Sequence, residues 1–487
     1  MTNNVIFLAK KKIRAVFLFV LLFLSFTAVA DNSNKVYHSQ VVIIGAGMAG
    51  ITAANKLYQN GIKDIVILEA RSRIGGRIWS FQPRNMLWKG RVLDLGAAYI
   101  HESRGNPLEK IAAKAKIKTQ TVDDDDYELY HENGQSVNEC YVEKSYELFQ
   151  AFEKYLAKQQ DREHDDSSRS VLDALSDFVK YKKIPKVYQP GLLFMVSSYI
   201  EYAHGVDIKY LSLIWFDNDE GFSGPDKIFP GGYSQLVNYM SRPVKDKIKL
   251  RSVVSKIDYT RASNISVYTK SGKVYHAKYV ICTVPIGVLQ KKRIYFVPQL
   301  PQNKLIAIHR HIGVSRYEKV YLLFPRVFWD SAFSIERILN STLSAGVWKF
   351  KMGWIDFTNY AKVKMLPVIQ ATYVGDFVAA VQSQTKKERV ESIMQALKSI
   401  YGKHIPKPLD VVFTDWSSDK YSDGSFSYLR PGALPDNRDF SNMAQPIKGH
   451  LLFAGEGTSR YYFGTVEGAY FSGIRAADYI LKKTKIK

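Results

Sequence analysis

The feature that most constrains the fold lies near the N-terminus, where an apolar run is followed at once by closely spaced glycines. Residues 41–44 read Val-Val-Ile-Ile, which suits a buried strand, and Gly45, Gly47 and Gly50 follow in a G-x-G-x-x-G pattern before a helical pattern through Leu57. In a strand–turn–helix unit the first glycine permits the tight turn, the second lets a pyrophosphate approach the backbone, and the third lets helix and strand pack closely. The pattern predicts a dinucleotide-binding unit.

A second strand and an acid complete this unit. Residues 65–68 are apolar and end directly in Glu69. An acid about 20 residues beyond the glycines is placed to accept a hydrogen bond from a ribose hydroxyl. A glycine-rich turn without a ligand would not explain this acid, so we expect the segment to hold the adenosine half of a dinucleotide.

Strand patterns recur in the middle and near the end of the chain, at residues 265–269, 273–276, 279–284 and 451–454. Less patterned stretches separate them, which favours a discontinuous enzyme with two domains. We predict a nucleotide-binding domain built from residues 39–115, 224–303 and 412–485. The second domain, expected to bind substrate, then comprises residues 116–223 and 304–411.

The first thirty residues are predicted to be a secretory signal peptide. Basic residues up to Arg14 precede the apolar run 15–24, and residues 28–30 read Ala-Val-Ala, a small-residue cleavage site. The apolar run is shorter than the roughly 20 residues that span a membrane, which favours cleavage over an uncleaved anchor. We therefore expect an exported protein, periplasmic or secreted, with no membrane-spanning segment after signal removal.

Charge and cysteine content narrow the classes of partner and site. The chain has 68 Lys and Arg residues against 46 Asp and Glu, a formal net charge of +22, which favours weak association with anionic surfaces. Cys140 and Cys282 are too few for a thiolate zinc or iron–sulfur site, although a disulfide between them is left open. His309 and His311 lack a third ligand, so we expect no metal site, and we expect no nucleic-acid partner.

The residues after Glu69 resemble a known family. They read Ala-Arg-Ser-Arg-Ile-Gly-Gly-Arg, and the flavin-dependent amine oxidases carry E-A-R-x-R-x-G-G-R after the second strand of their FAD-binding fold. Further motifs in the family's order lie at residues 95–101, 229–233, 280–289, 318–320 with 328–329, and 453–469. The motifs are most similar to those of polyamine and spermine oxidases. The resemblance implies an α/β fold: a discontinuous, Rossmann-like FAD-binding domain of the glutathione-reductase type and an α+β substrate-binding domain of the amine oxidase type.

The resemblance also implies a set of cofactor-binding residues. At the adenosine end, the backbone of Val254 would contact adenine and Glu69 would bind the ribose. Gly45, Gly47 and Gly50 would hold the pyrophosphate, and Arg77 would lie near the phosphates. At the flavin end, Glu456 would bind the ribityl chain and Val466 would lie at the pyrimidine edge; Arg71 and Gly76 are also expected to bind the cofactor. Monoamine oxidases bond the flavin through a cysteine where this chain has Ser425. We therefore expect noncovalent FAD.

Three residues are implied to act at the flavin. Lys319 is similar to the family lysine that holds a water at flavin N5, the alternative being a lysine at the surface end of a strand. Phe426 takes the first aromatic position of the family's amine cage. Thr465 stands where monoamine oxidases have the second aromatic residue, as in spermine oxidases and lysine-specific histone demethylases. Half a cage leaves room for a longer substrate.

Two positions favour polyamines. His101 matches the histidine of the W-I-H-G motif of polyamine and spermine oxidases, and Glu201 resembles the acid of the substrate domain that meets a distal ammonium. Each has a plainer alternative: His101 as a histidine of the core, and Glu201 as a charge on the surface of a helix. The positive net charge argues against polycationic substrates, although local acids could reverse this.

The implied reaction is oxidation of a C–N bond of a primary or secondary amine, with a polyamine favoured. Hydride would pass to flavin N5, with O2 as acceptor and aldehyde and H2O2 as products. An L-amino-acid oxidase, or an enzyme similar to tryptophan monooxygenase, is the first alternative. A secreted FAD protein whose main role is to bind anionic surfaces is the second. Histone demethylation fits less well, because the chain shows an export signal and no long coiled-coil insertion.

Overall fold

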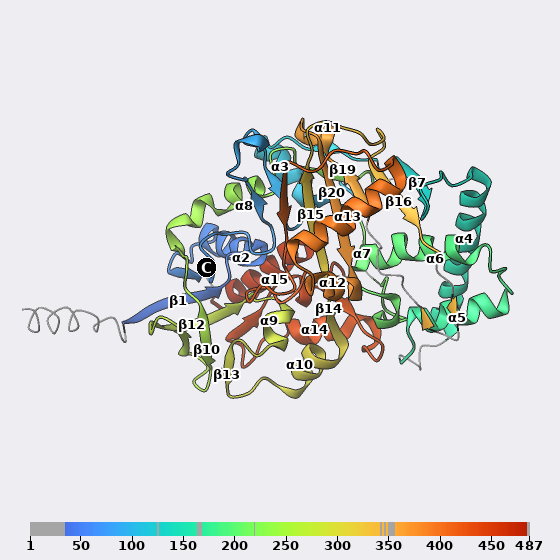
Figure 1. Cartoon of the computed structure of the whole chain (residues 1–487). Coiled ribbons are helices and arrows are strands. Elements are labelled where there is room, and N and C mark those ends of the chain that lie inside the picture. The colour runs from blue at the N-terminus through green and yellow to red at the C-terminus, as the bar shows by residue number, and fades with distance from the viewer. Residues whose placement is uncertain are drawn as a thin grey trace, which may run out of the picture.

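The computed structural model describes residues 35–123, 126–162, 168–218, 220–340, 343–344, 347–348 and 356–484. The predicted signal peptide, residues 1–30, lies outside these described residues. The fold is the mixed α/β fold that the sequence predicts, with two large sheets (Figure 1). No helix within the described ranges is both long and apolar enough to cross a membrane.

The first sheet carries the predicted glycine-rich unit. Its strands run in the order β13-β10-β11-β12-β1-β2-β9, and β23 pairs with β12. Their bounds are β1 (Val36–Ile44), β2 (Ile65–Leu68), β9 (Ile248–Lys249), β10 (Val254–Asp258), β11 (Ile265–Thr269), β12 (Val274–Cys282), β13 (Tyr295–Val297) and β23 (Leu451–Phe453). β1 is parallel to both β12 and β2. Val41 and Ile43 are buried on one face of the sheet and Val42 and Ile44 on the other, which explains the unbroken apolar run.

One predicted detail of this sheet is wrong. The sequence suggests two short strands at 273–276 and 279–284, and the structure has the single strand β12 from Val274 to Cys282. β1 pairs with β12 along its whole length, whereas on the other edge the first half of β12 pairs with β11 and the second half with β23. The change of pattern along the sequence reflects this change of neighbours and not a break in the strand.

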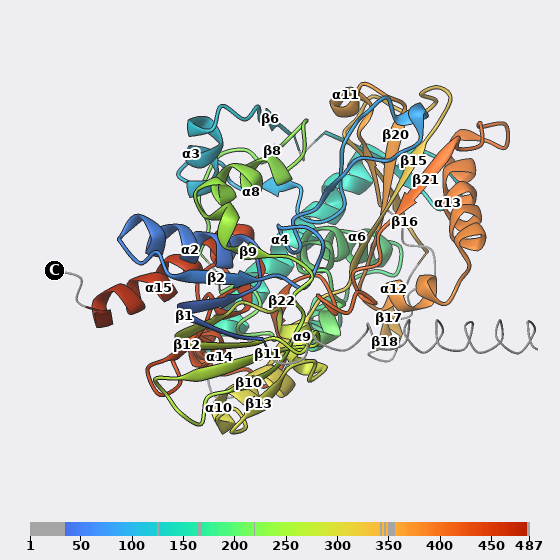
Figure 2. The same cartoon turned by 90° about the vertical axis from the view of Figure 1, so that its left-hand side faces the viewer.

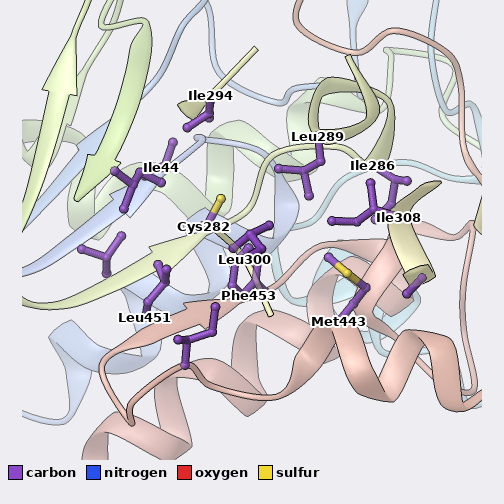
Figure 3. Close-up of a cluster of buried hydrophobic side chains, with 14 of the residues drawn as sticks. Ile44, Cys282, Ile286, Leu289, Ile294, Leu300, Ile308, Met443, Leu451 and Phe453 are labelled. Carbon is purple, nitrogen blue, oxygen red and sulfur yellow. The ribbon is translucent and has the colours of Figure 1, made fainter. Parts of the chain in front are cut away.

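The two faces of the first sheet are packed differently. On one face, α2 (Met48–Gln59) and α15 (Val466–Thr484) pack side by side over Val41 and Ile43. On the other face, Ile44 and Cys282 join an apolar cluster with residues of α9 (Ile286–Gln290) and β23 (Figure 3). Cys282 is buried there, whereas Cys140 is exposed, and both are free, so the disulfide left open by the sequence does not form.

The second sheet has six strands in the order β21-β15-β20-β19-β16-β7. Their bounds are β7 (Tyr127–His131), β15 (Tyr317–Leu323), β16 (Ser334–Ile338), β19 (Asp356–Asn359), β20 (Val368–Val374) and β21 (Asp410–Phe413). Along β15, Val320 and Leu322 pack with residues of α13 (Lys386–Tyr401), which covers the outer face (Figure 2). Because side chains alternate along a strand, Tyr317, Lys319 and Tyr321 point to the opposite, inner face.

A helical lobe lies beyond this sheet, at the right of Figure 1. It consists of α4 (Glu139–Arg162), α5 (Val171–Tyr181) and α6 (Gln189–Val196), and α6 continues into a π-helical turn η2 (Ser197–Glu201) and α7 (Tyr202–His204). Tyr188, Phe194 and Phe178 belong to its apolar core. Small sheets are formed by β14 (Ile312–Val314) with β22 (Ser427–Leu429), by β3 (Ser80–Phe81) with β4 (Leu93–Asp94) and by β5 (Tyr99–Ile100), β8 (Lys227–Ile228) and β6 (Gln120–Thr121) in that order.

The remaining elements are short or peripheral. They are β3 (Ser80–Phe81), β4 (Leu93–Asp94), β5 (Tyr99–Ile100), β6 (Gln120–Thr121), β8 (Lys227–Ile228), β14 (Ile312–Val314), β17 (Leu343–Ser344), β18 (Val347–Trp348), β22 (Ser427–Leu429), α3 (Pro107–Lys114), α8 (Ser234–Ser241), α10 (Gln302–Ile306), α11 (Ala361–Lys364), α12 (Gly375–Gln382), α14 (Arg438–Ala444), η1 (Met86–Trp88), η3 (Ile208–Tyr210), η4 (Arg242–Lys247), η5 (Ala307–His311), η6 (Pro435–Asn437) and η7 (Glu456–Thr458).

Candidate active site

A cavity of about 1370 Å³ runs from the glycine-rich turn of the first sheet to the inner face of the second sheet. A pocket for one drug-sized ligand has roughly 300–1,000 Å³. The larger volume fits a dinucleotide together with a substrate. The predicted site residues that line this cavity therefore share one continuous space.

The glycine-rich turn is shaped as its sequence requires. Gly45 has a φ of +105°, and a Cβ there would lie 2.4 Å from Oγ1 of Thr283. A Cβ at Gly50 would lie 2.0 Å from the carbonyl oxygen of Gly45, so α2 packs directly on the turn. Gly47, in contrast, has only ordinary contacts. The absent side chain at Gly47 is needed by a ligand and not by the fold, which supports the predicted approach of a pyrophosphate.

Glu69 lies at the end of β2 with its carboxylate held by the backbone. Oε2 accepts from the N–H of Ala46 and Oε1 from the N–H of Arg71, both at 2.8 Å. Burial raises the pKa of this carboxyl above its usual value, and the two hydrogen bonds oppose the rise. The side chain lines the cavity beside the turn, where it can accept from a ribose hydroxyl. Arg71 lines the same wall and makes a two-pronged ion pair with Asp419 at 2.6 and 2.9 Å.

The two motifs around Gly76 and Glu456 meet in the structure although about 380 residues separate them in sequence. Nη1 of Arg77 donates to Oε1 of Glu456 at 2.7 Å, and Glu456 also accepts from the N–H groups of Ser427 and Gly464. Gly76 has a φ of +59° and lies opposite Gly47. The pair of Arg77 and Glu456 therefore connects the part of the cavity predicted to bind the phosphates with the part predicted to bind the ribityl chain.

Val254 and Val466 bound the ends of the cofactor half of the cavity. Val254 is the first residue of β10 and is buried, and Val466 is the first residue of α15. Both line the cavity. Together with the glycine cradle and the buried Glu69, they fit an extended dinucleotide such as FAD.

Lys319 is buried, with an exposed fraction of 7%, so it is not a lysine at the surface end of a strand. Its Nζ lines the cavity and donates to the carbonyl oxygen of Gly96 at 2.8 Å, with the carbonyl oxygen of Asp94 at 3.4 Å. Burial lowers the pKa of Lys319 to about 8, because the apolar surroundings disfavour the charged form. The neutral form of this amine is therefore reached close to neutral pH, about a tenth of it at pH 7 and half at about pH 8.

Phe426 and Thr465 also line the cavity. Gly205 and Gly464 pack against the ring of Phe426. The hydroxyl of Thr465 donates to the carbonyl oxygen of Tyr462 and accepts from the N–H of Gly468, each at 3.0 Å, at the start of α15. Both hydrogen bonds of the Thr465 hydroxyl therefore go to the backbone. Because Thr465 is small, it leaves more room in the cavity than an aromatic residue would.

The sequence reasoning missed aromatic neighbours of Phe426. Tyr317 lies with its ring 6.2 Å from that of Phe426, and Tyr202 packs edge-on against Tyr317 at 5.3 Å. Both line the cavity. A signal existed for Tyr317, because it stands two residues before Lys319 on one strand and so must share its face. Tyr202 comes from the helical lobe, and only the tertiary structure brings it here.

His101 lies at the cavity wall and is not a histidine of the core, since its side chain is 61% exposed. Its ring stacks on Tyr99, and Nδ1 lies 2.5 Å from Oδ2 of Asp226. Burial is the largest single influence on Asp226 and raises its pKa, but the hydrogen bond with His101, the charge of His101 and the hydrogen bond from the N–H of Glu102 together outweigh it, so the pKa is lowered. A negative charge is therefore favoured at Asp226, and Glu467 lies nearby on the cavity wall.

The structure does not bring Glu201 to the cavity. Its side chain is buried within the lobe, where it accepts from the hydroxyl of Ser197 at 2.7 Å and from the N–H of Ile208 at 2.9 Å. Burial raises its pKa to about 8. Glu201 therefore lies neither at the cavity nor at the surface, and the residues of this segment that line the cavity are Ser198 and Tyr199 of the π-helical turn and Tyr202 of α7.

A different acid lines the substrate half of the cavity. Glu336 of β16 accepts a hydrogen bond from the hydroxyl of Ser198 at 3.0 Å. Burial raises the pKa of Glu336 to about 7. No local pattern predicts this position, because it depends on how β16 pairs within the second sheet.

No metal centre is found among the residues described here: no three or more His, Cys, Asp or Glu side chains in them are grouped to hold an ion. His311 pairs instead with the buried Asp439 at 2.8 Å.

Comparisons with known proteins identify the family of the chain. The sequence pattern of the family described as flavin containing amine oxidoreductase matches residues 48–481. A lysine-specific histone demethylase 1 homolog 3 from Oryza sativa is 32% identical over 90% of this chain and 54% of its own, and the human lysine-specific histone demethylase 2 is 29% identical over 92% and 54%. The chain spans about half the length of these curated relatives.

A solved structure of a redesigned putrescine oxidase has the same fold. It matches with a TM-score of 0.72 over 92% of this chain and all of its own, at 18% sequence identity. The predicted fold class is therefore confirmed, and FAD is the cofactor that the family and the cavity imply. By the match over residues 48–481, the chain belongs to the flavin-containing amine oxidoreductase family.

Proposed function

We propose that the protein is an FAD-dependent oxidase that cleaves a C–N bond of a primary or secondary amine, with a polyamine as the favoured substrate. The observation that carries the proposal is Lys319, a buried amine that opens into the same cavity as the dinucleotide cradle and the aromatic rings. When bound, FAD supplies the acceptor for a hydride and the route to O2, so that the products are an aldehyde and H2O2.

The chain's own contribution begins with Lys319. In its neutral form this amine has two N–H groups and one lone pair. The N–H groups can donate hydrogen bonds to the carbonyl oxygens of Gly96 and Asp94. The lone pair is then free to accept from a water in the cavity. The lowered pKa of about 8 favours this arrangement. We propose that Lys319 positions a water and that no side chain removes a proton from carbon.

Aromatic rings orient the substrate nitrogen. Phe426 and Tyr317 present π-faces and edges to the cavity, and such rings attract ammonium groups. The amine must lose its proton before hydride leaves, because an ammonium has no lone pair to stabilise the developing cation. Tyr99 adds a third aromatic ring to the cavity wall, and burial raises its own pKa well above the usual value.

The charges in the cavity support an amine over an amino acid. The arginines that line it each pair with a carboxylate: Arg71 with Asp419, Arg77 with Glu456 and Arg293 with Asp423. All three arginines are already paired, so none of them is free to bind the carboxylate of an amino-acid substrate. The substrate half instead carries acids, including Asp226, Glu467 and Glu336. These acids offset, within the cavity, the positive charge of the whole chain.

A second candidate follows from the relatives. Several of them are named lysine-specific histone demethylases, and Thr465 leaves the cage open on one side. A methylated lysine side chain of a peptide would then be the amine. A methylated lysine carries a single ammonium, at the reacting end, whereas a polyamine has further ammonium groups that the acids of the cavity could bind. The acids therefore favour a polyamine.

One experiment separates these substrates. The purified, FAD-loaded protein is mixed without oxygen with spermine, spermidine, an arylalkylamine, L-tryptophan or a dimethyllysine peptide, and the loss of oxidised flavin absorbance is followed. Fast bleaching by the polyamines alone supports the proposal. Fast bleaching by the peptide, the monoamine or L-tryptophan assigns the specificity elsewhere. No bleaching by any of them, with FAD bound, overturns the proposed activity.

A further inference from the structure

One arm of the cavity lies between the second sheet and the helical lobe. Its walls are apolar or aromatic, with Phe194, Met195, Tyr199 and Phe333 among its lining residues. No lysine or arginine lines the arm within the described part of the lobe and of β7, β16 and β19. His204 lines it too, but burial lowers the pKa of that imidazole to about 4, so it is neutral. Among the residues of β7, β16 and β19 that line the arm, Glu336 is therefore the one that carries a carboxyl group.

The register of the second sheet fixes where Glu336 lies relative to the reacting end. Lys319 pairs with Thr372 of β20, and Thr372 pairs with Asp356 of β19. The register of β19 with β16 puts Glu336 level with Asp356. Directly opposed residues share a face of the sheet, and Lys319 and Glu336 both line the cavity. They stand three strand spacings apart, a separation of roughly 14 Å.

Glu336 also has unused capacity to bind a cation. Its only partner among the described residues is the hydroxyl of Ser198, which donates one hydrogen bond at 3.0 Å. A carboxylate has about four lone-pair sites, so most of them have no donor among the described residues. A buried carboxylate without a cation is costly, and an ammonium placed beside it would stabilise the charged form.

We propose that Glu336, positioned by Ser198, binds the distal ammonium of the substrate and so selects linear diamines and polyamines by length. The inference rests on the proposed amine oxidation and adds to it a second anchor at a fixed distance. An amine nitrogen held among the rings near Lys319 leaves its chain to run along the inner face of the sheet. Spermidine and spermine are long enough to reach Glu336, whereas putrescine is too short.

A matched pair of substrates tests the anchor. 1,8-Diaminooctane and n-octylamine have the same chain and differ by the terminal ammonium. Steady-state oxidation of both is measured in the wild-type protein, in Glu336→Gln and in the control Glu128→Gln. Glu128 lies on the neighbouring strand β7 with an exposed side chain, and its substitution changes the charge equally. Flavin absorbance of each purified variant reports whether it folds and holds FAD.

The expected result is a rise of about 10- to 100-fold in KM for 1,8-diaminooctane in Glu336→Gln, with kcat little changed. The KM for n-octylamine stays within about twofold, and Glu128→Gln behaves as wild type. Ser198→Ala shows a smaller rise in the same direction, and Glu336→Asp restores part of the selectivity. Equal KM changes for both amines, or no change for the diamine, overturn the anchor while amine oxidation stands. Failure of the wild-type protein to oxidise either amine, or spermidine and spermine measured alongside them, would instead overturn the proposed function.

Discussion

At the scale of single residues, the site combines side chains whose placement follows from nearby sequence with others that depend on distant pairing. Glu69 follows its strand directly, so its position was predictable. Glu201 resembled a substrate-binding acid, but a π-helical turn carries its carboxylate to Ser197 and Ile208. Glu336 occupies the cavity because β16 pairs with β19 and β7, and no local pattern encodes that pairing.

Replacing Lys319 by methionine tests its role at the flavin. We expect Lys319→Met to slow anaerobic flavin reduction or aerobic reoxidation by about 10- to 100-fold, because the water held by Nζ is lost. FAD stays bound, since Lys319 contacts backbone carbonyls and not the glycine cradle. Stopped-flow absorbance measures both half-reactions. Lys304→Met removes another buried lysine outside the cavity and should leave the rates unchanged. Full activity of Lys319→Met would exclude Lys319 from the mechanism.

At the scale of elements, the turn between β1 and α2 separates what the fold needs from what the cofactor needs. A Cβ at Gly50 would clash with the carbonyl oxygen of Gly45 at 2.0 Å, whereas a Cβ at Gly47 meets nothing closer than 3.9 Å. We expect Gly50→Ala to lower both the Tm of the FAD-free protein and its FAD affinity. Gly47→Ala should keep the Tm and lower FAD affinity by at least about tenfold, because the methyl group would hinder the pyrophosphate.

Thermal unfolding of the FAD-free variants and fluorescence titration with FAD measure these two quantities. Equal FAD affinity of Gly47→Ala and the wild-type protein would show that the pyrophosphate does not approach this glycine. A normal Tm for Gly50→Ala would show that α2 can move away from the turn without cost.

The elements of this unit were predictable because strand, turn, helix and second strand are consecutive in the sequence. The single strand β12 was not, because its two halves have different neighbours and therefore different hydrophobic patterns. The aromatic wall beside Phe426 combines β15 with α7, and its assembly depends on how the helical lobe docks on the second sheet. Propensity and periodicity describe single elements and carry no information about such docking.

At the scale of the whole molecule, charge is unevenly distributed between the surface and the cavity. The net charge of +22 coexists with acids in the substrate half of the cavity. Lys270, Lys291, Lys292 and Lys420 line its cofactor half, where the phosphates of FAD are expected. Repulsion between the basic surface and a polyamine is screened beyond about 8 Å at physiological salt. Within the substrate half of the cavity, the nearby acids therefore outweigh the charge of the distant surface. Export of the chain and its association with anionic surfaces remain proposals.

The stability of the whole molecule should respond to pH through Lys304. This side chain is 1% exposed and donates to the carbonyl oxygens of Asn442 and Met443 at 2.6 and 2.8 Å. Burial lowers its pKa to about 7 in the folded protein, against about 10.4 in an unfolded chain. Between these values the unfolded chain binds a proton that the folded protein does not, so the contribution of Lys304 to stability rises with pH.

The rise is at most about 1.4 kcal/mol per pH unit, and Lys304→Met removes it while the other titrating groups stay the same in both proteins. From about pH 7 to about pH 9 we therefore expect the Tm of the wild-type protein to increase by a few degrees relative to that of Lys304→Met. Calorimetry of the FAD-free proteins at several pH values in this window gives the difference directly. A difference in Tm that stays constant across the window would mean that Lys304 keeps its proton when the protein folds, and that the two carbonyl groups stabilise the ammonium enough to offset its burial.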